Sequence, residues 1–75
     1  MRIVTANLNG IRSAQKKGFF AWLPGTAADI VCVQELKAQA GDLTAEMLNP
    51  PGADGHYHGY FHYAEKKGYS GVGLY

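Results

Sequence analysis

The chain has 75 residues, of which seven are Lys or Arg and six are Asp or Glu, so its formal net charge at pH 7 is +1. A chain of this length forms at most one small domain, and so small a charge does not by itself indicate a polyanionic partner. The single cysteine, Cys32, excludes an internal disulfide and favours a reducing compartment. No stretch reaches the roughly 18 apolar residues of a membrane span, and no signal peptide opens the chain, so we expect a soluble cytoplasmic protein.

Two strands are predicted in the first half of the chain. Residues 1–8 are predicted as a strand in which Ile3, Thr5 and Asn7 alternate with the apolar Val4, Ala6 and Leu8, and the Asn9-Gly10 pair that follows is a turn signal. The second strand covers residues 29–35. Its apolar run at 30–33 is rich in β-branched residues, which is typical of a central strand covered on both faces.

Two helices are predicted around the second strand. Residues 12–23 have helical spacing, with Ser13 as the N-cap and Gly18 as a point where the helix can divide. A short second helix begins at a cap formed by Asp42 or Thr44 and continues through residue 48, where two prolines break it.

Two further strands complete the pattern, at residues 56–63 and 69–75. Strand, helix, strand, helix and two strands indicate a layered α/β arrangement.

Both strands of the first half end in oxygen-bearing side chains. Asn7 ends the first strand and Glu35 ends the second. If the strands pair, a carboxylate and an amide carbonyl meet at one sheet edge, and such oxygen ligands suit Mg²⁺ or Mn²⁺. A divalent ion there would polarise a phosphoryl oxygen and position a water. An ordinary surface ion pair between Glu35 and Lys37 is the alternative.

Phosphate donors follow the first strand. Arg12 has a forked guanidinium, Lys16 and Lys17 have ammonium groups, and Ser13 adds a hydroxyl. Backbone N–H groups at the start of the helix would add to this set. For Lys16 and Lys17, a solvated helix face is the alternative.

The segment before the last strand joins a turn, an aromatic ring and two lysines. Gly68 and Tyr69 follow Lys66 and Lys67, so the ring can pack into a nucleic-acid groove beside a phosphate contact. The later glycines, Gly71 and Gly73, are instead typical of a tightly packed strand.

Cys32 and the histidines are weaker candidates. Cys32 lies within an apolar strand, as a small buried hydrophobe does, rather than in the setting of a reactive thiol. His56, His58 and His62 lie among aromatic residues, and no Cys-x-x-Cys pair accompanies them as in many zinc sites.

Three blocks of sequence combine these features. They are Asn7-Leu8-Asn9-Gly10-Ile11-Arg12-Ser13, Gln34-Glu35-Leu36-Lys37 and Lys67-Gly68-Tyr69-Ser70-Gly71-Val72-Gly73-Leu74. With these blocks the chain resembles the exonuclease III type apurinic/apyrimidinic (AP) endonucleases of the endonuclease/exonuclease/phosphatase superfamily. The resemblance runs along the whole chain but reaches only the N-terminal part of the family domain. It implies an α/β fold of the α+β type, as the N-terminal part of a four-layer αββα sandwich.

The resemblance also implies a function. Relatives of this type are Mg²⁺-dependent DNA-repair nucleases of base-excision repair that cleave the phosphodiester 5′ to an abasic site, and many add 3′ to 5′ exodeoxyribonuclease activity or removal of 3′ blocks. It implies that Asn7 and Glu35 form the catalytic and metal-binding pair. The residues that it implies in contact with duplex DNA are Arg12, Ser13, Lys16, Lys17, Gly68 and Tyr69. Asn9 occupies a position where relatives have Asp or Asn, and it either orients its neighbours or simply forms the turn.

Residues 71–75 stop within an apolar run, so we expect the domain to continue beyond Tyr75. The family's catalytic Tyr, its Asp-x-Asn pair and its Asp-His pair would follow there, and the 75 residues alone should be inactive and poorly folded. Two alternatives stay open: a phosphatase branch of the same superfamily, and a noncatalytic DNA-binding remnant. The block around Arg12 and the segment at 67–71 favour the DNA-repair branch.

Overall fold

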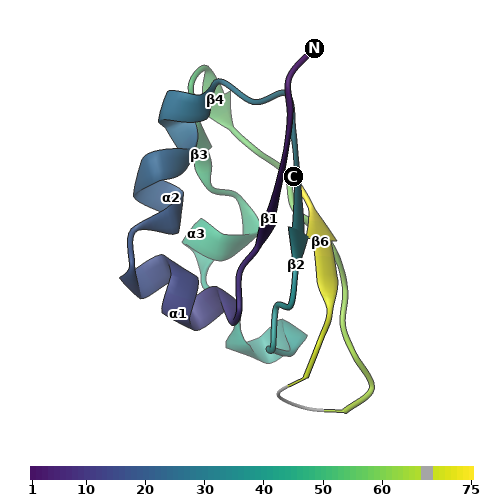
Figure 1. Cartoon of the computed structure of the whole chain (residues 1–75). Helices are drawn as coiled ribbons and strands as arrows, with labels where there is room; N and C mark the ends of the chain where they lie inside the picture. The colour runs from purple at the N-terminus through teal and green to yellow at the C-terminus, as the bar shows by residue number, and fades with distance from the viewer. Residues whose placement is uncertain (67–68) are drawn as a thin grey trace.

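Residues 1–66 and 69–75 are described by a computed structural model, and they form a mixed α/β fold, as the sequence predicts. The main sheet has four strands in the order β1 (Ile3–Asn7), β2 (Ile30–Gln34), β6 (Val72–Leu74) and β5 (Tyr60–His62). Strands β1 and β2 are parallel, whereas β6 pairs antiparallel with both β2 and β5. The chain therefore places its first two strands side by side (Figure 1).

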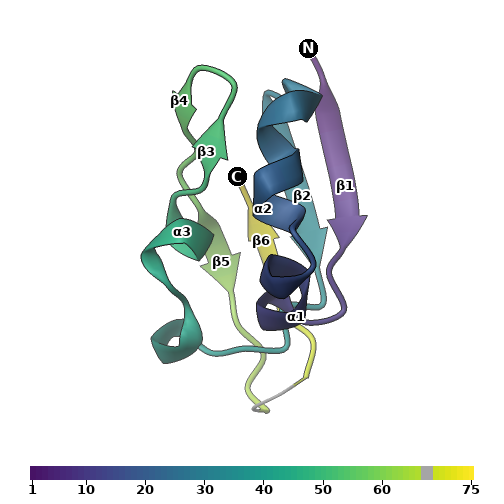
Figure 2. The same ribbon diagram turned by 90° about the vertical axis from the view of Figure 1, so that its left-hand side faces the viewer.

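A second layer lies on one side of this sheet (Figures 1 and 2). Its elements are α1 (Ile11–Lys16), α2 (Phe19–Trp22), the 3-10 turns η1 (Leu23–Thr26) and η2 (Ala40–Asp42), α3 (Ala45–Leu48), and a hairpin of β3 (Pro51–Gly52) and β4 (Gly55–His56). Helices α1 and α2 lie in front of β1 and β2 in the view of Figure 2, and α3 lies alongside them. In the described ranges, no helix has the length and apolar character to cross a membrane.

The first predicted helix is divided, and its N-cap is not Ser13. Gly18, at φ 92°, separates α1 from α2, so the predicted break is confirmed. The N-cap position of α1 is Gly10, which has no side chain to cap with. The N–H groups of Gly10 and Ile11 instead donate to the carbonyls of Glu35 and Leu36, both at 2.9 Å. The segment after β2 thus takes over the role predicted for Ser13.

The other predicted elements differ mainly in length. Thr44 caps α3 as predicted, since its hydroxyl accepts from the N–H of Met47 at 3.3 Å. The predicted strand at 56–63 is wrong in extent, because it is divided between β4 and β5. The N–H groups of Tyr57 and Gly59 donate to the carbonyls of Pro50 and Leu48, which draws this stretch away from the sheet. Strand β6 is likewise shorter than the predicted 69–75.

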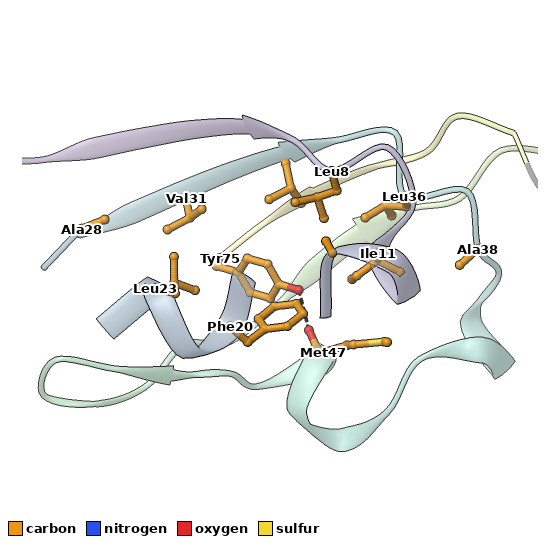
Figure 3. Close-up of a cluster of buried hydrophobic side chains, with 12 residues drawn as sticks. Leu8, Ile11, Phe20, Leu23, Ala28, Val31, Leu36, Ala38, Met47 and Tyr75 are labelled. Carbon is orange, nitrogen blue, oxygen red and sulfur yellow. Dashed lines mark hydrogen bonds between the residues drawn. The ribbon is translucent and has the colours of Figure 1, made fainter. Parts of the chain in front are cut away.

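The hydrophobic core fills the space between the two layers (Figure 3). Its largest fully buried side chains are Phe20, Ile11, Leu23, Leu36, Met47, Val31, Val33 and Pro50. Tyr75 joins them: its ring contacts the rings of Phe20 and Phe61, and its hydroxyl donates to the carbonyl of Met47. The core therefore ties β2 and β6 to the helical layer.

Among the described residues, no second layer covers the opposite face of the sheet. Val31 and Val33 of β2 point into the core, but Ile30 and Cys32 are only half-buried. Within the described residues only one face of β2 is covered, so the prediction that both faces are covered in the domain stays a prediction. Exposed apolar side chains extend this face onto the other strands, at Ile3, Tyr60, Val72 and Leu74. This face is where the sandwich implied by the resemblance would place its second sheet.

The buried hydroxyl of Tyr75 predicts a sensitivity to alkaline pH. Burial raises the pKa of Tyr75, and ionised Tyr63 raises it further. Because the folded pKa lies above the unfolded value of about 10, the free energy of unfolding should hold below that pH and fall as the pH rises above it. We expect Tyr75→Phe to cost about 0.5–1.5 kcal/mol at neutral pH through loss of the hydrogen bond, and to flatten the alkaline decline.

Thermal unfolding midpoints between pH 8 and 11 measure both effects. The matched control is Tyr60→Phe, which removes a hydroxyl from a ring that is 69% exposed and should leave the pH profile unchanged. If the unfolding midpoint of Tyr75→Phe fell with rising alkaline pH as steeply as that of the wild-type protein, Tyr75 would not be the source of the pH sensitivity.

Candidate active site

The carboxyl ends of β1 and β2 meet at one edge of the sheet. In the parallel register Asn7 is the partner of Gln34, and Glu35 follows directly. The N–H of Leu8 donates to the carbonyl of Gln34 at 2.9 Å, which continues the pairing past the end of β1. The prediction that these two strand ends lie together is confirmed.

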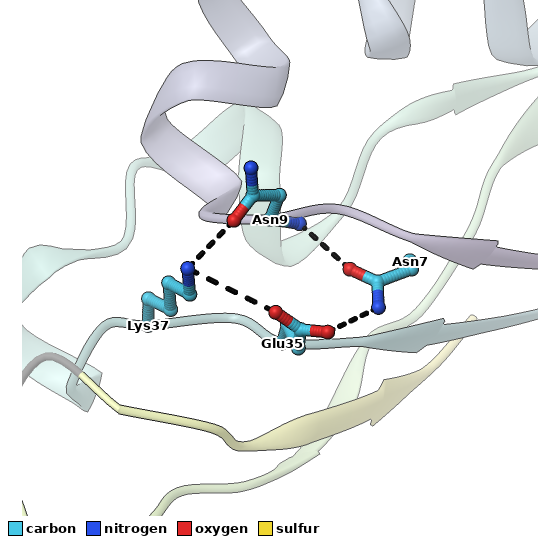
Figure 4. Close-up of polar contacts among 4 residues, drawn as sticks. All are labelled: Asn7, Asn9, Glu35 and Lys37. Carbon is cyan, nitrogen blue, oxygen red and sulfur yellow. Dashed lines mark hydrogen bonds and ion pairs between the residues drawn. The ribbon is translucent and has the colours of Figure 1, made fainter.

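Four side chains at this edge form a closed polar ring, defined by Asn7, Asn9, Glu35 and Lys37 (Figure 4). The amide nitrogen of Asn7 donates to Oε2 of Glu35, and Oδ1 of Asn7 accepts from the backbone N–H of Asn9 at 3.0 Å. The ammonium of Lys37 closes the ring, donating to Oδ1 of Asn9 at 2.6 Å and lying 3.8 Å from Oε1 of Glu35. Each member of the ring thus orients the next.

The backbone of three ring residues is left-handed. The φ angles are 47° at Asn9, 55° at Glu35 and 51° at Lys37. Asn adopts this conformation readily, but it is uncommon for long side chains such as Glu and Lys. Such strain costs of order 1–3 kcal/mol per residue and is found most often at functional sites. Two other non-glycine residues in the described ranges, Ala27 and Ser70, share this conformation, and Ser70 accepts the backbone hydrogen bond from Lys37.

Backbone hydrogen bonds hold the strained loop from a third segment. The N–H groups of Leu36 and Lys37 donate to the carbonyls of Gly71 and Ser70, at 3.2 and 2.8 Å. Gly71 is itself left-handed at φ 94°, and an added Cβ would lie 3.3 Å from the Cβ of Leu36. The residues before β6 therefore fix the loop that carries Glu35, and the glycine at 71 permits this close approach.

Glu35 is accessible, and its chemistry suits a hard divalent cation. Its side chain is 44% exposed, and that of Lys37 is 40% exposed. Mg²⁺ commonly binds through one or two carboxylates and keeps several waters, so a single exposed carboxylate fits it. In the described part of the chain, no three His, Cys, Asp or Glu side chains gather as a metal-binding group. The residues present thus match a partly hydrated ion held by one carboxylate.

Asn7 presents its nitrogen to Glu35 rather than its oxygen. Its Oδ1 is engaged by the N–H of Asn9, so the amide holds the carboxylate in place in this arrangement. The prediction that Asn7 is itself a metal ligand stays a prediction. Both predicted residues are nevertheless in direct contact.

The predicted phosphate donors are distributed around this corner. Arg12 reaches it directly, since its Nη2 donates to the carbonyl of Lys37 at 3.4 Å. Lys17 lines the same groove along β1 as Asn7 and Asn9. Ser13 and Lys16 are exposed on α1, and among the described residues no side-chain hydrogen bond joins either to the ring. The structure thus brings Arg12 and Lys17 to the site and leaves Ser13 and Lys16 on the helix surface.

Tyr69 is exposed close to the same corner. Its neighbour Ser70 accepts the backbone hydrogen bond from Lys37, and the ammonium of Lys66 lies 4.6 Å from the centre of the Tyr69 ring. Gly68 and Lys67, which belong to the same predicted DNA-contacting segment, lie outside the described residues.

Lys37 was not among the residues predicted from the sequence to form the site. The ion pair that it left open as the ordinary role of Glu35 is present, but Lys37 also bridges to Asn9. Asn9 in turn fills both roles considered for it, because it has a turn conformation and orients two neighbours. The signal that could have identified Lys37 is its positive charge two residues after Glu35, the carboxylate at the end of β2.

Residues 4–75 match the model of the endonuclease/exonuclease/phosphatase family. The chain belongs to this family. The match includes the polar ring and the Gly71 segment that supports it. The resemblance to this family that the sequence motifs indicated is confirmed.

The chain is also similar in sequence to individual nucleases. The chain is 40% identical to an exodeoxyribonuclease of Bacillus subtilis, with all of the chain and 27% of that protein aligned. It is 41% identical to DNA-(apurinic or apyrimidinic site) endonuclease 2 of Xenopus laevis, over 96% of the chain and 13% of that protein. A DNA repair nuclease of Danio rerio is 35% identical, over 99% of the chain and 23% of that protein. The chain thus spans about a quarter or less of the length of these relatives.

Proposed function

We propose that the chain contributes the metal-binding edge of a DNA-repair nuclease that cleaves the phosphodiester 5′ to an abasic site. The observation that carries this proposal is the strained polar ring around Glu35, at the carboxyl ends of two paired strands. The names of the relatives support the nuclease class and a substrate of DNA. Exodeoxyribonuclease activity and removal of 3′ blocks belong to the same proposal.

Glu35 is the residue that would hold a divalent cation, Mg²⁺ or Mn²⁺. When bound, such an ion polarises the phosphoryl oxygen and stabilises charge on the leaving oxygen. Asn7 keeps the carboxylate of Glu35 oriented through its amide nitrogen, and Asn9 holds Asn7 through its backbone N–H. This chain's own contribution is therefore a carboxylate pre-positioned by its neighbours, which lowers the cost of organising the site.

Duplex DNA would approach across Arg12, Lys17 and Tyr69. Arg12 and Lys17 are exposed and lie at the corner of the ring, so they can bind phosphates on the strand being cleaved. The exposed ring of Tyr69 supplies a packing contact. Ser13 and Lys16 extend this proposed surface along α1. A DNA contact from Gly68, which lies outside the described residues, stays a prediction. Such contacts recognise DNA by its backbone and shape rather than by base sequence.

The chain is further proposed to act as the N-terminal portion of a larger domain. The exposed apolar side chains on the sheet face opposite the helical layer support this, because a second layer would cover them. The cytoplasmic location stays a prediction.

The experiment that tests the proposed function uses an intact nuclease containing residues 1–75. A duplex with one abasic site is incubated with a series of Mg²⁺ concentrations, and the ends of the products are identified. We expect Mg²⁺-dependent incision on the 5′ side of the lesion and little incision of an undamaged duplex. Release of phosphate from small phosphoesters without incision would instead favour the phosphatase branch. Binding without any cleavage would favour a noncatalytic protein.

Arg12 should contribute a phosphate contact. We expect Arg12→Ala to weaken binding to duplexes of any sequence and to reduce the slope of log affinity against log salt by about one. Its hydrogen bond to Lys37 is long, at 3.4 Å, so loss of that bond should disturb the loop little.

The matched control is Arg2→Ala. Arg2 precedes β1 at the end opposite Asn7, where its side chain donates to the carbonyl of Thr26. Both variants lose one positive charge, but only Arg12→Ala should change the salt slope. An unchanged slope in Arg12→Ala would place Arg12 in a purely structural role.

A further inference from the structure

The ammonium of Lys37 is held beside Glu35 by the backbone around it. The N–H of Lys37 donates to Ser70, its carbonyl accepts from Arg12, and its φ of 51° turns the side chain back toward the ring. The ammonium then lies between Oδ1 of Asn9, at 2.6 Å, and Oε1 of Glu35, at 3.8 Å. Three segments of the chain therefore converge to place one positive charge next to the carboxylate proposed to bind metal.

In this position the ammonium of Lys37 would repel a divalent cation bound by Glu35. A cation bound by Glu35 and the ammonium carry charges of the same sign, and their repulsion at such short range is substantial even in water. Lys37 is 40% exposed, so its flexible side chain has room to move away from the carboxylate. An anionic phosphate beside the ring would offer the displaced ammonium a new partner.

We propose that Lys37 is a resident counter-ion of Glu35, which weakens binding of a divalent cation to the DNA-free enzyme and binds a substrate phosphate once displaced. The inference rests on the proposed function, because it takes Glu35 as the metal-binding group. It makes cation and DNA bind cooperatively: DNA removes the charge that opposes the cation, and by linkage the cation strengthens DNA binding by the same factor. Lys37 then couples the two binding events.

The first test measures Mn²⁺ binding to the DNA-free protein by electron paramagnetic resonance. Lys37→Met removes the charge and keeps most of the apolar stem. We expect it to bind Mn²⁺ about three- to tenfold more tightly than the wild-type protein, in line with the energies of exposed ion pairs and the double charge of the ion. Lys37→Arg, which restores the charge, should return the affinity toward the wild-type value. Arg2→Met, the charge-matched control at the other end of β1, should leave it unchanged.

A second variant separates charge from structure. Lys37→Gln keeps an N–H donor on a side chain one atom shorter and carries no charge, so it should also bind Mn²⁺ more tightly. Thermal unfolding of each variant shows which are folded, and affinities are compared among those. Unchanged or weaker Mn²⁺ binding in folded Lys37→Gln or Lys37→Met would overturn the proposal, because Lys37 would then only brace Asn9.

The coupling itself is measured with an abasic duplex protected from cleavage by a phosphorothioate. Its affinity is determined with and without Mn²⁺ for the wild-type protein, Lys37→Met and Lys37→Arg. We expect the Mn²⁺-induced gain in DNA affinity to shrink in Lys37→Met and to return in Lys37→Arg. An equal gain in all three proteins would overturn the coupling.

Glu35→Gln distinguishes this inference from the proposed function. If Glu35→Gln binds Mn²⁺ as well as the wild-type protein, the assignment of the metal to Glu35 is wrong and the proposed function fails with it. If Glu35→Gln loses Mn²⁺ but Lys37→Met and Lys37→Gln gain no affinity, only the role of Lys37 is wrong.

Discussion

Replacing Glu35 by Gln should abolish most incision at an abasic site while leaving the fold intact. Gln has nearly the same shape and can still accept the hydrogen bond from Asn7, but it lacks the negative charge that we propose binds the cation. Stabilisation of the transition state by a metal ion is worth several kcal/mol, and about 1.4 kcal/mol corresponds to a tenfold change in rate. We therefore expect a loss of about 10²- to 10³-fold, largest at low Mg²⁺.

The control for this change is Glu46→Gln. Glu46 is an exposed carboxylate on α3 that accepts a hydrogen bond from Gln15 at 2.8 Å, away from the polar ring. It undergoes the same chemical substitution and should retain normal incision. Near-normal incision by Glu35→Gln at saturating DNA and low Mg²⁺ would show that Glu35 does not bind the catalytic ion.

Replacing Gly73 by Ala should destabilise the protein strongly for so small a change. A Cβ at this position would lie 2.6 Å from Cδ1 of Phe61 and 3.0 Å from Cγ2 of Val33. The Phe61 ring also contacts the rings of Tyr63 and Tyr75, which restricts how it can move away. Overpacking of this kind costs about 1–3 kcal/mol, and in a domain of this size about 1 kcal/mol lowers the unfolding midpoint by about 4–8 °C.

The control for this change is Gly41→Ala. Apart from its chain neighbours and the backbone of its own turn, no atom lies within 4 Å of the position that its Cβ would occupy. Thermal unfolding of the two variants should therefore show a large fall in the midpoint for Gly73→Ala and almost none for Gly41→Ala. Equal midpoints would mean that β2, β5 and β6 can separate enough to admit a methyl group.

The part of the site that lies at the ends of the strands could be predicted from the sequence. Apolar runs that end in Asn7 and Glu35 were sufficient to predict that a carboxylate and an amide meet, because parallel neighbours end at the same edge. The break at Gly18 and the cap at Thr44 also followed from local chemistry. These features depend on only a few adjacent residues.

Features that depend on distant partners were missed. Ser13 is a good capping residue, but the N–H groups at the start of α1 find carbonyls in the loop after β2, which no local pattern encodes. The hairpin of β3 and β4 has strands of two residues each, too short for an alternating pattern. Lys37 joined the site through Asn9 and Ser70, contacts that arise only once three loops are assembled.

The left-handed backbone at Glu35 and Lys37 bears on how this protein would respond to laboratory evolution. Glycine adopts that conformation without steric cost, so glycine at either position would relieve strain of order 1–3 kcal/mol. A screen for heat resistance alone would therefore favour variants that have lost the polar ring. Thermostable descendants of this chain are best selected with an activity requirement in every round.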